Sequence, residues 1–142
     1  MQSFKNPLPN INQNSISTKE IESIIKSLKS KNSSGYDEIS TNLINTSSPF
    51  ISSLLTHIYS KSISSGIFPD CLKYAVVKPL FKEGEKSKIF NCRPISILSS
   101  FSKVLEKVMY NQLQKHLNKY SILAEEQVGF RSDSTTNKAI YN

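Results

Sequence analysis

The chain has 142 residues, enough for one domain with a hydrophobic core and too few for two domains of ordinary size. Its formal net charge of +7 favours a polyanionic partner, although a basic surface without any such partner has the same charge. No apolar run approaches the ~20 residues that span a membrane, so we expect no membrane partner. The two cysteines lack metal-ligand spacing, and so few cysteines fit a reducing compartment. We therefore expect an intracellular protein, cytoplasmic or nuclear.

The first segment is rich in Asn, Pro and Ser, and residues 1–16 are expected to form an extended polar arm. A capping box follows, in which Ser17 precedes Glu20 by three residues. Apolar residues then recur at helical spacing, which predicts a helix from 17 to about 29.

Two further helices are expected before the middle of the chain. A short one is predicted over 39–46, and Pro49 is well placed as the first residue of the next. Gly66 is its expected stop. The side chains that this helix is expected to bury are Phe50, Ile51, Leu54, Leu55, Ile58 and Ile63.

The following segment predicts a small β-hairpin and a long helix. Residues 74–77 favour a strand that Pro79 ends or confines to a sheet edge. The polar segment 82–88 is the predicted turn, and 94–98 is the expected partner strand. A long helix is predicted to begin near Ser99, with the apolar stripe Phe101, Val104, Leu105, Val108, Met109, Leu113 and Leu117. The whole pattern indicates a helix-rich α+β fold.

Four stretches, in this order, resemble the N-terminal blocks of the reverse transcriptases of non-LTR retrotransposons (LINE-type, jockey-like). They are 31–40 (KNSSGYDEIS), 66–84 (from GIFPD to LFKEG), 91–98 (NCRPISIL, continued by SKVLEK) and 126–131 (EQVGFR). The sequence departs from that pattern at Cys92, where the family usually has an aromatic residue. The resemblance implies the fingers, and the start of the palm, of a right-hand polymerase. Residues 17–142 would then be a partial reverse transcriptase domain, truncated before the catalytic aspartates.

The resemblance assigns nucleotide binding to Lys82 and Arg93, which match basic residues that reach the triphosphate of the incoming nucleotide. The forked guanidinium of Arg93 suits phosphate oxygens. Without the resemblance, Lys82 is read as a solvated turn lysine and Arg93 as a partner in a structural ion pair. The chain has only two arginines, Arg93 and Arg131, and both fall inside the matching blocks.

The last block resembles the link from fingers to palm. There Gln127, Gly129, Phe130 and Arg131 are expected to lie near the template or the nucleotide. The alternative is an ordinary turn with Phe130 in the core and Arg131 exposed. Lysines at 103, 107, 115 and 119 flank the long helix and either track a template backbone or face solvent.

The metal ligands of such a polymerase are expected to be absent. The three aspartates, Asp37, Asp70 and Asp133, stand outside the family's catalytic patterns, and the first two are better read as turn residues. We therefore assign no catalytic residue, no metal ligand and no cofactor to this chain, although the parent enzyme would use Mg²⁺.

The sequence thus predicts a fragment of an RNA-directed DNA polymerase of a mobile element, inactive alone. Its expected partners are those of the parent enzyme: RNA template, DNA primer and deoxynucleoside triphosphate. The alternative is a non-catalytic basic module, derived from the same source, that binds RNA or DNA or a polymerase.

Overall fold

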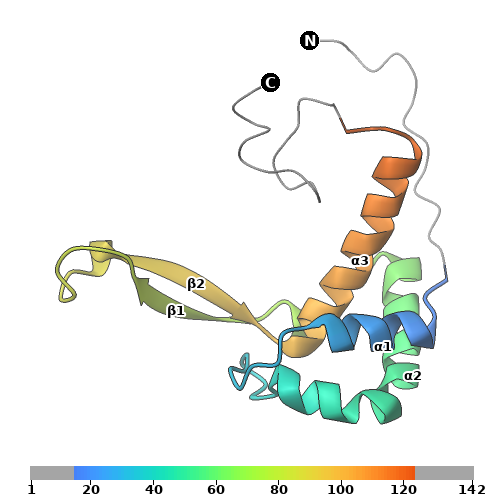
Figure 1. The fold of residues 1–142 in the computed structure, drawn as a ribbon, viewed down its shortest axis with the longest axis horizontal. Helices are drawn as coiled ribbons and strands as arrows, with labels where there is room; N and C mark the ends of the chain where they lie inside the picture. Colours follow the sequence, from blue (N-terminus) through green and yellow to red (C-terminus); the bar gives the residue numbers. More distant parts are fainter. Residues whose placement is uncertain (1–14, 124–142) are drawn as a thin grey trace. The chain divides into compact units, whose positions relative to one another are not determined.

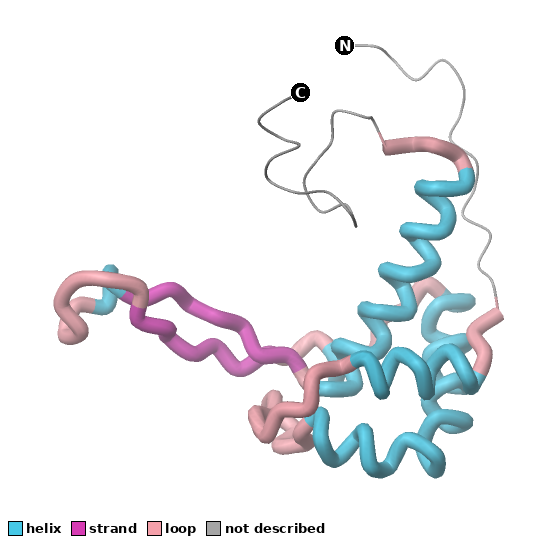
Figure 2. Tube along the Cα trace, viewed as in Figure 1, coloured by secondary structure: helices cyan, strands magenta, loops and turns pink. Residues whose placement is uncertain are grey.

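The computed structural model of the chain describes residues 15–123. These comprise two compact units that are considered separately, residues 15–109 and residues 110–123. The described elements are α1 (Thr18–Ser27), α2 (Thr41–Ser65), the 3₁₀ turn η1 (Asp70–Leu72), β1 (Ala75–Phe81), the 3₁₀ turn η2 (Ile89–Asn91), β2 (Cys92–Leu98) and α3 (Ser100–Lys119). Helices and strands are both present, as the sequence predicts (Figure 2). Most of the predicted N-terminal arm, residues 1–14, lies outside the described residues.

The first unit is built around a core to which all three helices contribute. α1 begins as predicted, because the Ser17 hydroxyl accepts a hydrogen bond from the Glu20 N–H at 3.1 Å. It ends at Ser27, two residues before the predicted end. The buried apolar side chains of the core are Ile16, Ile21, Ile24, Ile25, Ile44, Leu55, Tyr59, Val104, Leu105 and Val108.

The prediction of two helices around Pro49 is wrong, because α2 runs through that proline without a break. A proline inside a helix lacks the N–H that would bond to the carbonyl four residues earlier, and it commonly bends the helix. The ribbon of α2 does change direction along its length (Figure 1). The predicted stop is confirmed, since Gly66 caps α2 in the left-handed conformation with φ 69°.

The predicted buried face of α2 is also wrong in part. Phe50, Leu54 and Ile58 are 85%, 61% and 40% exposed. The helix instead buries a face on which four small hydroxyl residues are interspersed with three larger side chains, one of them the Leu55 that was expected to be buried. That buried face consists of Thr41, Ile44, Ser48, Ser52, Leu55, Tyr59 and Ser62.

The predicted hairpin is confirmed, with longer strands than expected. β1 extends through Pro79 to Phe81 and pairs in antiparallel fashion with β2. The hairpin extends away from the helices of its unit (Figure 1). Most side chains on both of its faces are exposed. A two-stranded ribbon with no layer against it depends on its attachment for stability.

The predicted long helix is confirmed as α3, with its stripe buried only as far as Val108. Met109 and Leu113, at 46% and 44%, are exposed.

In the second unit, the Tyr120 ring lies 4.8 Å from the ring of His116 and 5.2 Å from the Lys119 Nζ. None of the helices within residues 15–123 has the length and apolar character needed to cross a membrane.

Candidate nucleotide-binding hairpin

The hairpin places the two predicted nucleotide-binding residues at the same end of the ribbon. Arg93 lies directly opposite Leu80, and Lys78 lies opposite Ile95. Directly opposed residues share a face, and successive residues alternate faces, so Lys78 and Arg93 lie on one face. Lys82 follows two residues after Leu80, and its N–H donates to the Asn91 carbonyl at 2.9 Å, which extends the ladder by one step. Lys82 therefore continues the same face.

Two prolines oppose each other in the middle of the ribbon without breaking it. Pro79 pairs with Pro94, three steps along the ladder from the hydrogen-bonded pair Lys82–Asn91. Counting back along the ladder puts the prolines at a non-hydrogen-bonded pair, where neither residue needs an N–H. The outer sides of both strands are open, so the missing donors leave no gap in the sheet. This explains why Pro79 does not end β1.

One amide side chain holds the loop at the tip of the hairpin. Gly84 has φ 86°, and a Cβ at that position would lie 2.7 Å from the Asn91 Nδ2. The same Nδ2 donates to the Glu85 carbonyl at 2.9 Å. Gly84 and Asn91 thus fix the turn between Lys82 and Arg93.

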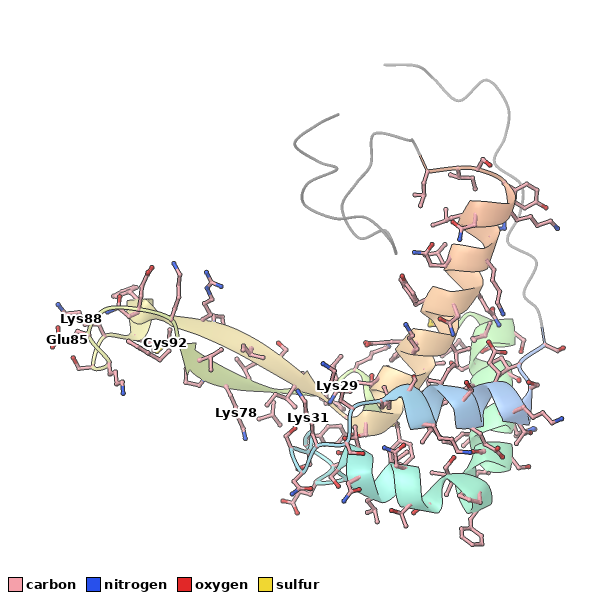
Figure 3. All side chains as sticks on the ribbon, viewed as in Figure 1. Lys29, Lys31, Lys78, Glu85, Lys88 and Cys92 are labelled. Carbon is pink, nitrogen blue, oxygen red and sulfur yellow. The ribbon has the colours of Figure 1, made fainter. Side chains whose placement is uncertain are left out.

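The charges at the tip are exposed and weakly paired. Lys82 Nζ lies 2.5 Å from Glu83 Oε1, and Lys88 Nζ lies 3.0 Å from Glu85 Oε2. Figure 3 shows Glu85 and Lys88 together at the far end of the hairpin. The hydrogen bond from Lys88, followed by that from Ser87, lowers the pKa of Glu85 below its usual value. Exposed pairs of this kind contribute about 0–1 kcal/mol, so a phosphate can displace Glu83 from Lys82 at small cost.

Two residues that the sequence did not single out lie on or near this part of the hairpin. Lys78 adds a third cation to the face of Arg93, and Figure 3 shows it pointing away from the ribbon. Phe90, beside the tip, is 95% exposed. Only the strand register could have shown the position of Lys78, because it depends on which residues face each other. The arrangement as a whole offers cations next to apolar surface, which suits a ligand with both phosphates and a flat ring.

The loop that contains Gly35 and Tyr36 contacts the hairpin at its root, where β1 begins and β2 ends. A Cβ on Gly35 would lie 2.8 Å from the backbone N and Cα of Ser99, so the loop and the end of β2 meet backbone to backbone. The neighbouring Tyr36 packs edge-on against Tyr74, just before β1, with ring centroids 5.6 Å apart. Its hydroxyl also donates to the Cys71 carbonyl. The stretch 31–40, the first of the four that resemble reverse transcriptases, therefore contacts the stretch 66–84 and the end of the stretch 91–98.

Buried hydroxyls fasten the start of α3 to the rest of the unit. The Ser99 hydroxyl accepts from the Ser102 N–H at 3.0 Å and caps the helix. Ser100 donates to the Ile39 carbonyl at 3.0 Å, and Ser102 donates to the Leu72 carbonyl at 2.7 Å. The buried Tyr59 donates to the Phe101 carbonyl at 3.0 Å. The sequence indicated a helix start here, but not that these serines are buried anchors.

Asp37 and Asp70, the two aspartates of the described residues, lie in turns. No group of three potential His, Cys, Asp or Glu ligands occurs within residues 15–123. Asp37 accepts from the Ile39 N–H at 3.3 Å, and Asp70 pairs with Lys73 at 2.6 Å, so both act in turns as predicted. The remaining predicted site residues, Gln127, Gly129, Phe130 and Arg131, lie outside the described residues.

Comparison with known proteins supports the resemblance noted in the sequence. No protein-family model matches the chain. Over 127 residues it is 31% identical to a protein of Drosophila melanogaster described as a probable RNA-directed DNA polymerase from transposon BS. The matched part covers 89% of this chain and 14% of that relative, so the chain spans only a small share of the relative's length. The similarity supports a relationship to the reverse transcriptases of mobile elements.

Proposed function

We propose that this chain is the fingers portion, with the start of the palm, of the RNA-directed DNA polymerase of a LINE-type, jockey-like mobile element. The observation that carries the proposal is that Arg93 and Lys82 lie on one face of the hairpin, beside a tip shaped by Gly84. Arg93 comes from one matching block and Lys82 from another, and the fold brings them together. The similarity to a transposon polymerase supports the same assignment.

In this proposal the hairpin binds the triphosphate of the incoming deoxynucleotide. Arg93 offers two parallel N–H donors to phosphate oxygens, and Lys82 adds a mobile point charge. Phosphoryl transfer relies on positioning and on stabilising negative charge, which is the task of these residues. The metal ions of the reaction, with their carboxylates, would be held by other parts of the parent enzyme, because Asp37 and Asp70 are engaged in turns.

A nucleotide titration of the chain followed by ¹H–¹⁵N NMR tests the proposal. Deoxythymidine triphosphate should shift the amide signals around Lys82 and Arg93 more than those of α1. Arg93→Ala should weaken this binding roughly ten- to a hundredfold, since a hydrogen bond between charged groups contributes about 1.5–3 kcal/mol. Arg93→Lys should recover only part of the affinity, because lysine cannot bind in the forked geometry. Lys19→Ala, an exposed lysine on α1, is the matched control.

Two outcomes would count against the proposal. Equal affinity of the wild-type chain and Arg93→Ala would remove the nucleotide role of the hairpin. Binding of RNA without any response to nucleotide would favour the alternative of a non-catalytic RNA- or DNA-binding module. Primer extension with Mg²⁺ by this chain alone is expected to be absent, and incorporation of labelled nucleotide would overturn the assignment of no catalytic residue.

A further inference from the structure

A small pocket in the first unit is lined by three lysines. Its volume is about 190 Å³. The lining side chains are Leu28, Lys29, Lys31, Ser33, Thr41 and Lys103. They come from the turn after α1, the first residue of α2 and the first turn of α3. Residues 72 positions apart, Lys31 and Lys103, thus face one cavity.

The loop that carries two of these lysines is fixed by a buried side chain. The Thr41 hydroxyl, 5% exposed, accepts from the Lys31 N–H at 3.0 Å. It also lies 3.1 Å from the carbonyl oxygens of Lys29 and Lys31, to either of which it can donate. Figure 3 shows Lys29 and Lys31 close to the place where the hairpin joins the helices. The backbone that carries the two lysines is therefore held in position by the fold.

The positive charges around the pocket favour binding of an anion. No acidic side chain of the described part of the chain lines it. Within residues 15–123, none of the three ammonium groups is seen in an ion pair. Like charges around one cavity repel each other, and a bound anion relieves that repulsion.

The size and lining of the pocket indicate a phosphate group. Pockets for small organic ligands usually enclose roughly 300–1,000 Å³ and are mostly apolar. This one is smaller, at about 190 Å³, and although Leu28 and the alkyl stems of the lysines make much of its surface apolar, three of the six described side chains that line it carry a positive charge. Lysines provide point charges without the fixed fork of arginine, which suits contact with a strand backbone in any base sequence.

We infer that Lys29, Lys31 and Lys103 form a binding site for a phosphodiester of a single-stranded nucleic acid. The site lies beside the root of the hairpin, because the same loop meets the end of β2 through Gly35. The inference rests on the proposed function in that the strand is taken to be the template. It does not require that the hairpin bind nucleotide.

Salt-dependent binding of fluorescent oligouridylate tests this site. Lys31→Gln and Lys103→Gln should each weaken binding roughly two- to fivefold, the range for an exposed ion pair. Each should also reduce the magnitude of the slope of log K against log[KCl] by about 0.7 for each phosphate that the variant no longer neutralises. Lys31→Arg and Lys103→Arg should restore the slope, whereas Lys19→Gln, the control, should leave it unchanged.

Parallel measurements separate this inference from the proposed function. If the two Gln variants keep the wild-type slope while nucleotide still shifts the signals of Arg93, the pocket is not a strand site and the hairpin assignment stands. If the variants change the slope but nucleotide shifts nothing, the pocket binds a strand and the hairpin assignment fails. Signals of Lys29–Ser33 that respond to inorganic phosphate and not to oligouridylate would identify a free-phosphate site and overturn the inference.

Discussion

At the scale of single residues, glycine and small hydroxyl side chains hold segments of the first unit together. Gly35 and the serines at the start of α3 have no large apolar surface. They act by close approach and by hydrogen bonds to buried carbonyls. Such roles cannot be predicted from hydrophobic periodicity, because that pattern identifies large apolar side chains only.

Gly35→Ala should destabilise the chain by about 1–3 kcal/mol, the usual cost of overpacking. The added methyl carbon would lie 2.8 Å from the Ser99 backbone, which cannot move without shifting the start of α3. Urea unfolding followed by circular dichroism measures the change. Ser33→Ala, at an exposed position of the same loop, is the control. An unchanged free energy of unfolding for Gly35→Ala would show that the loop can withdraw from Ser99.

Tyr59→Phe should lower the free energy of unfolding by about 1 kcal/mol, because the Phe101 carbonyl loses its donor. The effect should depend on pH. Burial raises the pKa of Tyr59 above its usual value of 10.0. The folded state therefore holds this proton more tightly, and the resulting stability is complete below about pH 10 and is lost as the pH rises further.

Unfolding at pH 9 and at pH 11 tests the pH dependence. Between pH 10 and pH 11, the free energy of unfolding of the wild-type chain should fall by up to about 1.4 kcal/mol more than that of Tyr59→Phe. Tyr74→Phe, at an exposed position, should behave like the wild type. Identical pH profiles for the wild type and Tyr59→Phe would mean that the buried phenol is not what resists ionisation.

At the scale of elements, the sequence predicted which helices and strands exist, and their order, better than where each one ends and which face it buries. α1, the hairpin and α3 were expected close to where they lie, because caps, turns and long periodicity are local signals. α2 was misread, since Pro49 looked like a helix start and two of its faces carry apolar side chains. Which face is buried depends on the fit to α1 and α3, and that fit is not encoded within the helix itself.

The opposed prolines of the hairpin should limit pairing with other chains. Both strands have open outer edges and exposed apolar residues such as Val77 and Leu80. Such edges invite strand addition, and proline removes the donor that an added strand would need. The double variant Pro79→Val/Pro94→Val should therefore self-associate more strongly in sedimentation velocity. A variant with Lys78→Gln, which retains both prolines, is the comparison. Unchanged sedimentation of the double variant would show that other features protect the edges.

At the scale of the whole chain, stability should be uneven within the first unit. The helices share a buried core, whereas the strands of the hairpin are exposed on both faces. Amides of β1 and β2 should thus exchange with deuterium through openings of lower free energy than amides around Val104 and Val108. Hydrogen exchange followed by NMR measures both groups together. Equal protection would mean that the hairpin opens only when the core unfolds.

The candidate site was predictable in its residue types and not in its assembly. The matching blocks pointed to Lys82 and Arg93, and the register of the ribbon explains why they share one face. Lys78 and the pocket of three lysines depend on contacts between segments far apart in the sequence. A charged residue that lies alone in a sequence looks solvated until the fold shows which other charges surround it.

The loop that contains Gly35 and Tyr36 has a mechanical consequence. It contacts the end of β2 through one residue and the approach to β1 through the next, so a shift of this loop displaces both strands together. The same loop carries Lys31 of the pocket. A strand bound in the pocket and a nucleotide bound at the tip would therefore act on one connected body, and any effect of the strand on the affinity for nucleotide would be matched by an equal effect of the nucleotide on the affinity for the strand.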